Sequence, residues 1–286
     1  MGTESKLEAA GFELRELDRG GTRLRYFVGG SGPPLVLVHG LGGAPSNWLL
    51  VAPGLAAERR VVVPALPGHG GSGGLPAAET LDPYAEAVLA VLDHEDALPA
   101  PWVGHSLGGI IGLRAAVLRP DAVTGLVLAA AAGISSSTPT GSATVAALGR
   151  VRPERLIRPY RRRVAHSAAG RTVAFGWWGV ADPVGFDPAM AEAFLDGAAE
   201  QTDTRTAGLA LVRSDSRRDL DRVGCPCLCL WGASDNWVPV DDGMEYARRL
   251  RAPLRLIADC GHLLIGERPE AVTAAVRDFL ALLDAG

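Results

Sequence analysis

The chain lacks the features that would place it in a membrane or outside the cell. No apolar run reaches the roughly 18 residues that a spanning helix needs. The first residues, Met1 to Glu16, are charged and contain no apolar stretch of the kind found in a signal peptide. We therefore expect a cytoplasmic protein that does not act at a membrane.

Cysteine and lysine are also scarce. The 4 cysteines are too few for a disulfide scaffold in 286 residues. Cys225, Cys227 and Cys229 alternate along one apolar segment, without the C-x-x-C pair or nearby histidine pair that zinc prefers, so we predict buried thiols and no metal site. Lys6 is the only lysine, and the 28 basic and 32 acidic residues give a net charge of −4. Nothing in that balance indicates a nucleic-acid partner.

Apolar residues are abundant, at 48% of the chain, and they recur in short runs. The first two runs, 12–17 and 24–28, alternate apolar and charged residues, which predicts a hairpin with one solvated face that turns at Gly20-Gly21. The later runs are apolar throughout, as in parallel strands that helices cover on both faces. The candidate strands are 12–17, 24–28, 35–38, 61–64, 102–104, 126–130, 227–231 and 254–258.

Helical patterns lie between the later strands. They cover 81–92, 107–118, 240–251 and 269–283. Strand and helix therefore alternate, which predicts an α/β fold with a mostly parallel, eight-stranded sheet flanked by helices. One long stretch, 134–219, has no apolar β run and reads as a helical cap inserted into a core made of 1–133 and 220–286.

The pattern G-x-S-x-G, which can expose a serine nucleophile on a sharp strand-to-helix turn, occurs twice. Residues 70–74 lie in a glycine-rich loop that no helix follows. Residues 104–108 instead come after an apolar strand and open directly into the helical run 107–118. Glycine at both ends of that turn avoids collisions, and the helix N-terminus points its positive end at a developing oxyanion. We therefore predict that Ser106, rather than Ser72, is the nucleophile.

At this point the chain resembles the α/β-hydrolase family, over nearly all of its length except the insertion. The matching motifs are His39-Gly40-Leu41-Gly42-Gly43, Pro67-Gly68-His69-Gly70, Gly104 to Gly109, Gly232 to Asp235 and Gly261-His262. Five motifs in the family's order are far more specific than any one of them. The resemblance implies the α/β-hydrolase fold and a catalytic triad in the chain order Ser, acid, His.

A serine hydroxyl needs a base within hydrogen-bond reach and an acid that orients the base. Only His166 and His262 follow Ser106 in the chain, and His166 lies in the insertion beside arginines, so His262 is the expected base. Asp235 follows an apolar strand through a short turn, at the family's position for the acid. Asp259 is the rival because it is close to His262 in sequence, and we expect it to be a local hydrogen-bonding residue.

The resemblance also implies an oxyanion hole and a pocket. It assigns the two oxyanion donors to the backbone N–H groups of Leu41 and Leu107, and it implies that His39 is structural support. Our candidate pocket residues are Trp48, His105, Trp177 and Trp178. The tryptophan pair is either an apolar ceiling over the pocket or the core of the cap itself. These residues favour a small-molecule substrate with an apolar acyl or ring portion.

The first half of the insertion contains an arginine-rich run. Between residues 134 and 175 the chain has eight arginines and one acid, Glu154. The run could recruit an anionic substrate or an acidic carrier protein. We favour a solvated cap surface balanced by acidic residues of the body, because charge runs usually face water. The arginines are Arg150, Arg152, Arg155, Arg158, Arg161, Arg162, Arg163 and Arg171.

The leading functional hypothesis is a serine hydrolase that cleaves a carboxylic ester or lactone through an acyl-enzyme, with no metal or organic cofactor. A carbon–carbon bond hydrolase of a ring-cleavage diketone is an alternative, although such relatives usually have tryptophan where this chain has Leu263. An acyltransferase or perhydrolase would use the same triad. The non-enzymatic alternative is a ligand receptor on a hydrolase scaffold. Oligomeric state is not predicted.

Overall fold

The computed structural model describes residues 3–75, 78–141, 143, 158–199 and 201–285 of the chain. Its centre is an eight-stranded sheet in the order β1-β2-β4-β3-β5-β6-β7-β8. The strands are β1 (Glu13–Arg19), β2 (Thr22–Gly29), β3 (Pro34–Val38), β4 (Arg60–Pro64), β5 (Ala100–His105), β6 (Val123–Ala129), β7 (Cys227–Gly232) and β8 (Leu254–Ile257). All eight predicted strands are confirmed.

The first two strands form the predicted edge hairpin. Arg19 pairs with Thr22 across the turn, and the two residues between them, Gly20 and Gly21, have φ angles of +61° and +83°. Glycine adopts such positive φ values without steric penalty, which is why this tight turn forms here. β2 then pairs antiparallel with β4, and every pairing from β4 to β8 is parallel.

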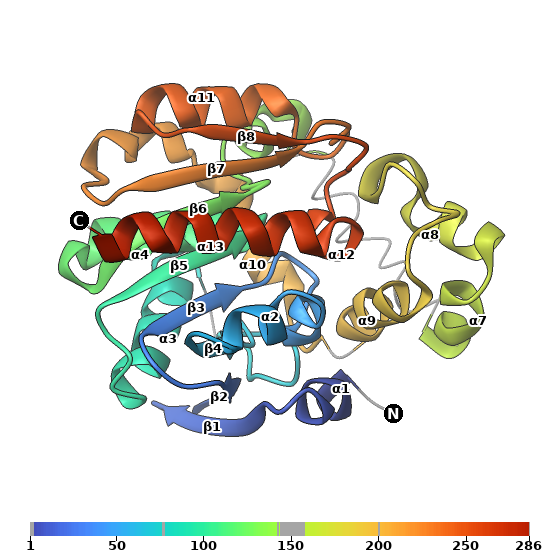
Figure 1. Ribbon diagram of the computed structural model, residues 1–286, viewed down its shortest axis with the longest axis horizontal. Coiled ribbons are helices and arrows are strands. Elements are labelled where there is room, and N and C mark those ends of the chain that lie inside the picture. Colours follow the sequence, from blue (N-terminus) through green and yellow to red (C-terminus); the bar gives the residue numbers. More distant parts are fainter. Residues whose placement is uncertain (1–2, 76–77, 142, 144–157, 200, 286) are drawn as a thin grey trace.

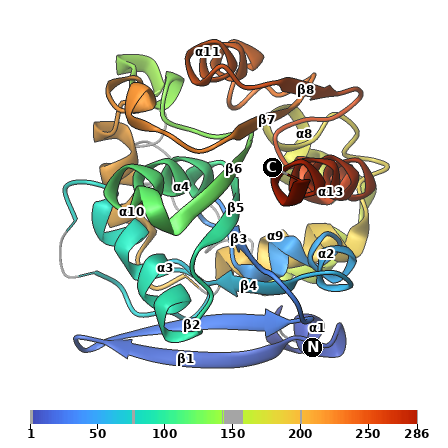
Figure 2. The ribbon, with the colours of Figure 1, turned by 60° about the vertical axis from the view of Figure 1, so that its left-hand side comes forward.

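Helices cover both faces of the sheet, with α3 and α4 on one face and α2 and α13 on the other (Figure 2). The four predicted helices match α3, α4, α11 and α13. Sequence patterns did not predict α1, α2 or α12. The helices are α1 (Thr3–Ala9), α2 (Ala52–Ala56), α3 (Asp82–His94), α4 (Leu107–Leu118), α7 (Arg161–Ala165), α8 (Ala168–Gly179), α9 (Pro188–Ala199), α10 (Thr204–Arg213), α11 (Val240–Leu250), α12 (Leu264–Glu267) and α13 (Pro269–Ala285).

The central parallel strands are the most buried part of the molecule. Every residue of β5 and β7 is buried, and only the first residue of β3 and of β4 is partly exposed. This burial is what uninterrupted apolar runs require, because such strands have no face that tolerates water. The core therefore fixes the strands whose carboxyl ends carry the candidate site residues.

The chain between β6 and β7 contains four described helices, α7 to α10, and no strand among the residues that the structure describes. Helices α7, α8 and α9 gather beyond one end of the sheet, toward which β7 and β8 point (Figure 1). A second hydrophobic cluster forms there, separate from the main core; its buried members are Ala165, Phe175, Val180, Phe186, Met190, Ala191 and Leu263. Leu263 follows the candidate base, so this cluster reaches the candidate site.

Part of the predicted insertion lies outside the described residues, including Arg150, Arg152 and Arg155. Within the described ranges, no helix combines the length and the apolar composition needed to cross a membrane.

Candidate active site

Ser106 occupies a strained turn between β5 and α4. Its backbone has φ +53° and ψ −115°, a conformation that non-glycine residues rarely adopt. Hydrogen bonds on both sides hold the strain: the Ser106 N–H donates to the Ala129 carbonyl at 2.9 Å, and the Ser106 carbonyl accepts from Gly109 and Ala132 at 3.0 and 3.2 Å. The turn projects the serine from the carboxyl end of the sheet.

The two flanking glycines are required by direct contact between backbone segments. A Cβ on Gly104 would lie 2.3 Å from the carbonyl oxygen of Gly108, and a Cβ on Gly108 would lie 2.2 Å from the carbonyl oxygen of Val38. Neither position can accept a side chain unless the backbone moves. The strand, the turn and the helix can therefore pack this closely only with glycine at both positions.

Asp235 and His262 form a buried hydrogen-bonded pair. The Asp235 Oδ2 lies 2.9 Å from the His262 Nδ1, and both side chains are almost completely shielded from solvent. The other carboxylate oxygen, Oδ1, accepts from the backbone N–H groups of Trp237 and Val238, both at 2.8 Å. Because an ionised carboxylate only accepts hydrogen bonds, this contact places a proton on Nδ1 and leaves the Nε2 lone pair of the imidazole available.

The structure distinguishes the predicted acid from its rival. Asp259, the rival in the sequence, is exposed, whereas Asp235 contacts His262. Asp235 lies in the loop after β7, and His262 lies in the loop after β8.

His105 links the turn of Ser106 to the loop of His262. Its Nε2 lies 2.9 Å from the His262 carbonyl oxygen, so Nε2 carries a proton and donates it there, and the two rings are 5.0 Å apart. Burial lowers the pKa of His105 to about 3, so this imidazole is neutral near pH 7. Its described hydrogen bond is thus to backbone, and its predicted place in the pocket stays a prediction.

The loop after β3 turns directly against the candidate nucleophile. A Cβ on Gly40 would lie 3.1 Å from the Cβ of Ser106. The Gly40 carbonyl accepts from the Nδ1 of His39 at 2.8 Å, and the Nε2 of His39 accepts from the Leu66 N–H at 3.1 Å. His39 therefore holds this loop through both ring nitrogens, which agrees with its interpretation as structural support.

The two predicted oxyanion donors flank this contact. Leu41 follows Gly40 in the chain, and Leu107 is the first residue of α4. The first N–H groups of a helix have no acceptor within the helix, so the N–H of Leu107 is free of intrahelical bonding. Their role as donors remains a prediction that this arrangement allows.

The second G-x-S-x-G match has a different structure. The Ser72 side chain is buried, its hydroxyl donates to the Ala65 carbonyl at 2.9 Å, and it accepts from the Arg25 N–H at 2.9 Å. Both hydrogen-bonding roles of this hydroxyl are therefore used to connect loop and strand.

The three predicted pocket tryptophans lie in different surroundings. Trp178 of α8 is half-buried and packs edge-on, at 5.8 Å between rings, against Trp237 in the loop of Asp235. It also packs on the second hydrophobic cluster, as the interpretation as the core of the cap expects, and its role as a ceiling over the pocket stays a prediction. Trp48 is fully buried in the main core, and its role as a pocket wall stays a prediction. The side chain of Trp177 lies outside the described part of the structure.

Acids of α9 balance part of the arginine run. Arg161 pairs with Asp196, and Arg162 pairs with Glu192 at 3.4 Å. The interpretation as a charge-balanced surface therefore fits Arg161 and Arg162 of α7. For these two arginines the acids lie within the inserted segment itself and not on the body.

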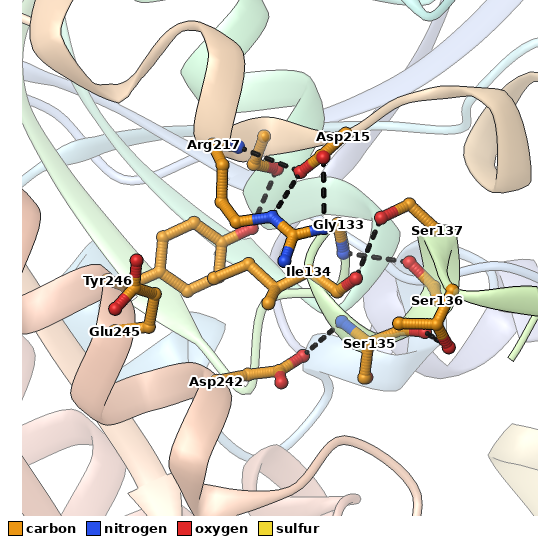
Figure 3. Close-up of polar contacts among 12 residues, drawn as sticks. Gly133, Ile134, Ser135, Ser136, Ser137, Asp215, Arg217, Asp242, Glu245 and Tyr246 are labelled. Atoms are coloured by element: carbon orange, nitrogen blue, oxygen red, sulfur yellow. Dashed lines mark hydrogen bonds and ion pairs between the residues drawn. The ribbon is translucent and has the colours of Figure 1, made fainter.

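Both ends of the inserted segment meet at α11 in a polar network (Figure 3). The Tyr246 hydroxyl donates to the Ala132 carbonyl and accepts from the Ser216 hydroxyl, both at 2.7 Å. The Asp242 carboxylate accepts from the Ser135 N–H at 2.9 Å. Burial raises the pKa of Asp242. Because the Ala132 N–H also donates to the Ser106 carbonyl, this network is connected to the strained turn. Sequence reasoning missed it.

Within the described ranges, no three His, Cys, Asp or Glu side chains converge in a way that would hold a metal ion. Cys225 is half-buried, Cys227, Cys229 and Cys260 are buried, and all four are free thiols. Burial raises the pKa of Cys229 to about 12.

Comparison with known proteins places this geometry in a family. The model of the alpha/beta hydrolase family matches residues 35–276, and the chain belongs to that family. It is 34% identical to the dihydrolipoyllysine-residue acetyltransferase component of the acetoin cleaving system of Pseudomonas putida, over 96% of this chain and 70% of that protein. It is 32% identical to the pimeloyl-[acyl-carrier protein] methyl ester esterase of Aromatoleum aromaticum, over 87% of this chain and 98% of that one.

The chain is also similar in fold to a solved esterase structure. The thermophilic esterase from Thermogutta terrifontis superposes with a TM-score of 0.74 at 25% identity, over 95% of this chain and 99% of that chain. The fold and the family are those that the sequence predicts, and a hydrolase is the class of enzyme that these relatives support.

Proposed function

We propose that the chain is a serine hydrolase that cleaves a carboxylic ester or lactone through an acyl-enzyme on Ser106. The observation that carries the proposal is the buried Asp235–His262 pair, tied through His105 to the strained turn of the serine. An esterase that is 32% identical over nearly its whole length adds support for ester chemistry.

In the proposed mechanism, the Nε2 of His262 takes the proton of the Ser106 hydroxyl as its oxygen attacks the substrate carbonyl. The negative oxygen that develops accepts hydrogen bonds from the N–H groups of Leu41 and Leu107, and losing one such donor typically costs about 3 kcal/mol of barrier lowering. His262 then gives the proton to the leaving alcohol, and Asp235 stabilises the imidazolium. Water, activated by the same imidazole, hydrolyses the acyl-enzyme and restores the serine.

We propose that the segment 134–219 is the cap of this site. Support comes from Trp178, which packs against Trp237 in the acid loop, and from Leu263, which joins the hydrophobic cluster of the segment. Both contacts put apolar surface beside the candidate catalytic residues, which favours an apolar acyl or ring portion in the substrate.

Steady-state hydrolysis of an ester and lactone panel tests the proposal, with a ring-cleavage diketone included. We expect turnover of at least one ester or lactone, its loss in Ser106→Ala, and a fall in kcat of about 10⁴-fold in Asp235→Asn, which leaves the imidazole in the wrong tautomer. Ser72→Ala is the matched control and should keep its turnover. A diketone cleaved faster than every ester would overturn the ester assignment in favour of carbon–carbon hydrolysis. A folded protein that turns over nothing would favour a receptor.

A further inference from the structure

Glu267 is a buried carboxylate whose two oxygens bind different parts of the molecule. It is the last residue of α12, five positions after His262, and is 9% exposed. Its Oε2 accepts from the Gly261 N–H at 2.6 Å. Its Oε1 accepts from the N–H groups of Ala181 and Asp182 at 2.7 and 3.0 Å.

These three donors belong to two elements far apart in sequence. Gly261 immediately precedes the candidate base, whereas Ala181 and Asp182 follow α8 in the segment between β6 and β7. The carboxylate therefore joins the loop of His262 to the inserted segment. Hydrogen bonds from N–H groups to a buried carboxylate are charge-assisted, and they are stronger than those between neutral groups.

The two elements also touch directly. The Leu263 N–H donates to the Gly179 carbonyl at 2.8 Å, and a Cβ on Gly261 would lie 2.8 Å from that carbonyl oxygen and from the Cα of Val180. The loop of His262 is therefore packed against the end of α8 with no space between them. A change in how the inserted segment sits would shift the backbone on both sides of His262.

We propose that Glu267 is a positioning residue that makes the placement of the His262 imidazole depend on the docking of the segment after α8. The inference rests on the proposed role of His262 as the base. Only a carboxylate can accept hydrogen bonds from both elements, because one of its oxygens binds the loop of His262 and the other binds the residues after α8. Glutamine has one carbonyl oxygen, and its NH₂ group cannot accept, so Glu267→Gln must leave one of the two elements without its acceptor.

The expected catalytic consequence is a loss of reaction rate rather than of substrate affinity. A shift of about 1 Å at a reacting group can cost about 10²-fold in rate. We therefore expect Glu267→Gln to lower kcat and the rate of phosphonylation by a fluorophosphonate by about 10- to 100-fold, with KM changed by less than about threefold.

Glu95→Gln is the matched control. Glu95 is also a buried carboxylate, 7% exposed, but its partners are Arg15 of β1, Tyr26 of β2 and Arg60 of β4. We expect this variant to lose stability and to keep the wild-type phosphonylation rate. A general loosening of the fold would slow both variants equally, and that result would overturn the proposal.

Two readouts complete the experiment. Hydrogen exchange should become faster at Gly261 or at Ala181 and Asp182 in Glu267→Gln, and not in the control. A folded Glu267→Gln variant that reacts at the wild-type rate, or whose amides exchange as in the wild type, would refute the proposal. If this variant does not fold, Glu267→Asp, which keeps the charge but shortens the reach, should show the same slowing, and a wild-type rate there would refute it.

The design separates this inference from the function on which it rests. A wild-type protein that is not phosphonylated at Ser106 refutes the proposed function. In that case, hydrogen exchange at Gly261, Ala181 and Asp182 tests by itself whether Glu267 joins the two elements. If the wild-type protein is phosphonylated and the Glu267→Gln variant reacts at the same rate, only the positioning role of Glu267 is refuted.

Discussion

Three buried histidines predict that the protein loses a large part of its stability in mild acid. Burial lowers the pKa of His39 to about 3, of His69 to about 4 and of His105 to about 3. In the unfolded chain a histidine titrates near 6.5. As the pH falls below 6.5 the unfolded state binds protons that the folded state refuses, so the stabilisation present above 6.5 is lost progressively toward the folded pKa values.

The size of the effect follows from these pKa values. At about pH 5, protonation of each of these histidines in the unfolded chain lowers the free energy of unfolding by about 2 kcal/mol. The three together lower it by about 6 kcal/mol. A domain typically has only about 5–15 kcal/mol of stability in total. We therefore expect a large loss between about pH 7 and about pH 5.

Urea unfolding followed by tryptophan fluorescence measures this loss, and His69→Gln tests its origin. The Nδ1 of His69 donates to the Pro67 carbonyl at 2.9 Å, and a glutamine amide can also donate there. The variant should lose about one third of the pH dependence. His94→Gln is the control, because His94 is exposed at the end of α3. An unfolding free energy that is equal at both pH values would refute the reasoning.

Three shorter predictions concern the turn and its supports. Gly108→Ala forces a Cβ to within 2.2 Å of the Val38 carbonyl oxygen, so we expect a destabilisation above about 3 kcal/mol in urea unfolding, and a value below about 1 kcal/mol would contradict it. Tyr246→Phe removes the hydroxyl that joins both ends of the inserted segment and should destabilise by about 1–3 kcal/mol, measured by thermal unfolding. Ser72→Ala removes the hydroxyl that bonds to the Ala65 carbonyl and the Arg25 N–H and should lower stability without removing phosphonylation of Ser106; loss of labelling in a folded variant would contradict this.

The fold could be predicted because its signals are local. The strand β5, the turn at Ser106 and the helix α4 follow from an apolar run, two glycines and a helical pattern within twenty residues. Apolar runs also marked every strand of the sheet. The three helices that patterns missed are short, between four and seven residues, and such lengths carry too little periodicity to detect.

The surroundings of the candidate site could not be predicted because they depend on long-range contacts. Glu267 and Trp237 gain their partners from α8 and the residues after it, more than fifty positions away in sequence. Nothing in the local pattern around either residue indicates that meeting. Sequence proximity made Asp259 a rival acid, and the packing of the β7 and β8 loops brings Asp235, the predicted acid, into contact with His262.

Peptide mass spectrometry of the wild-type protein after reaction with a fluorophosphonate tests the central claim most directly. We predict one covalent adduct, on the peptide that carries Ser106, while the Ser72 peptide in the same digest stays unmodified. The adduct should form at a rate that falls sharply in His262→Ala, because the hydroxyl then has no base. An adduct on another residue, or an equal rate in the folded His262→Ala variant, would contradict the account.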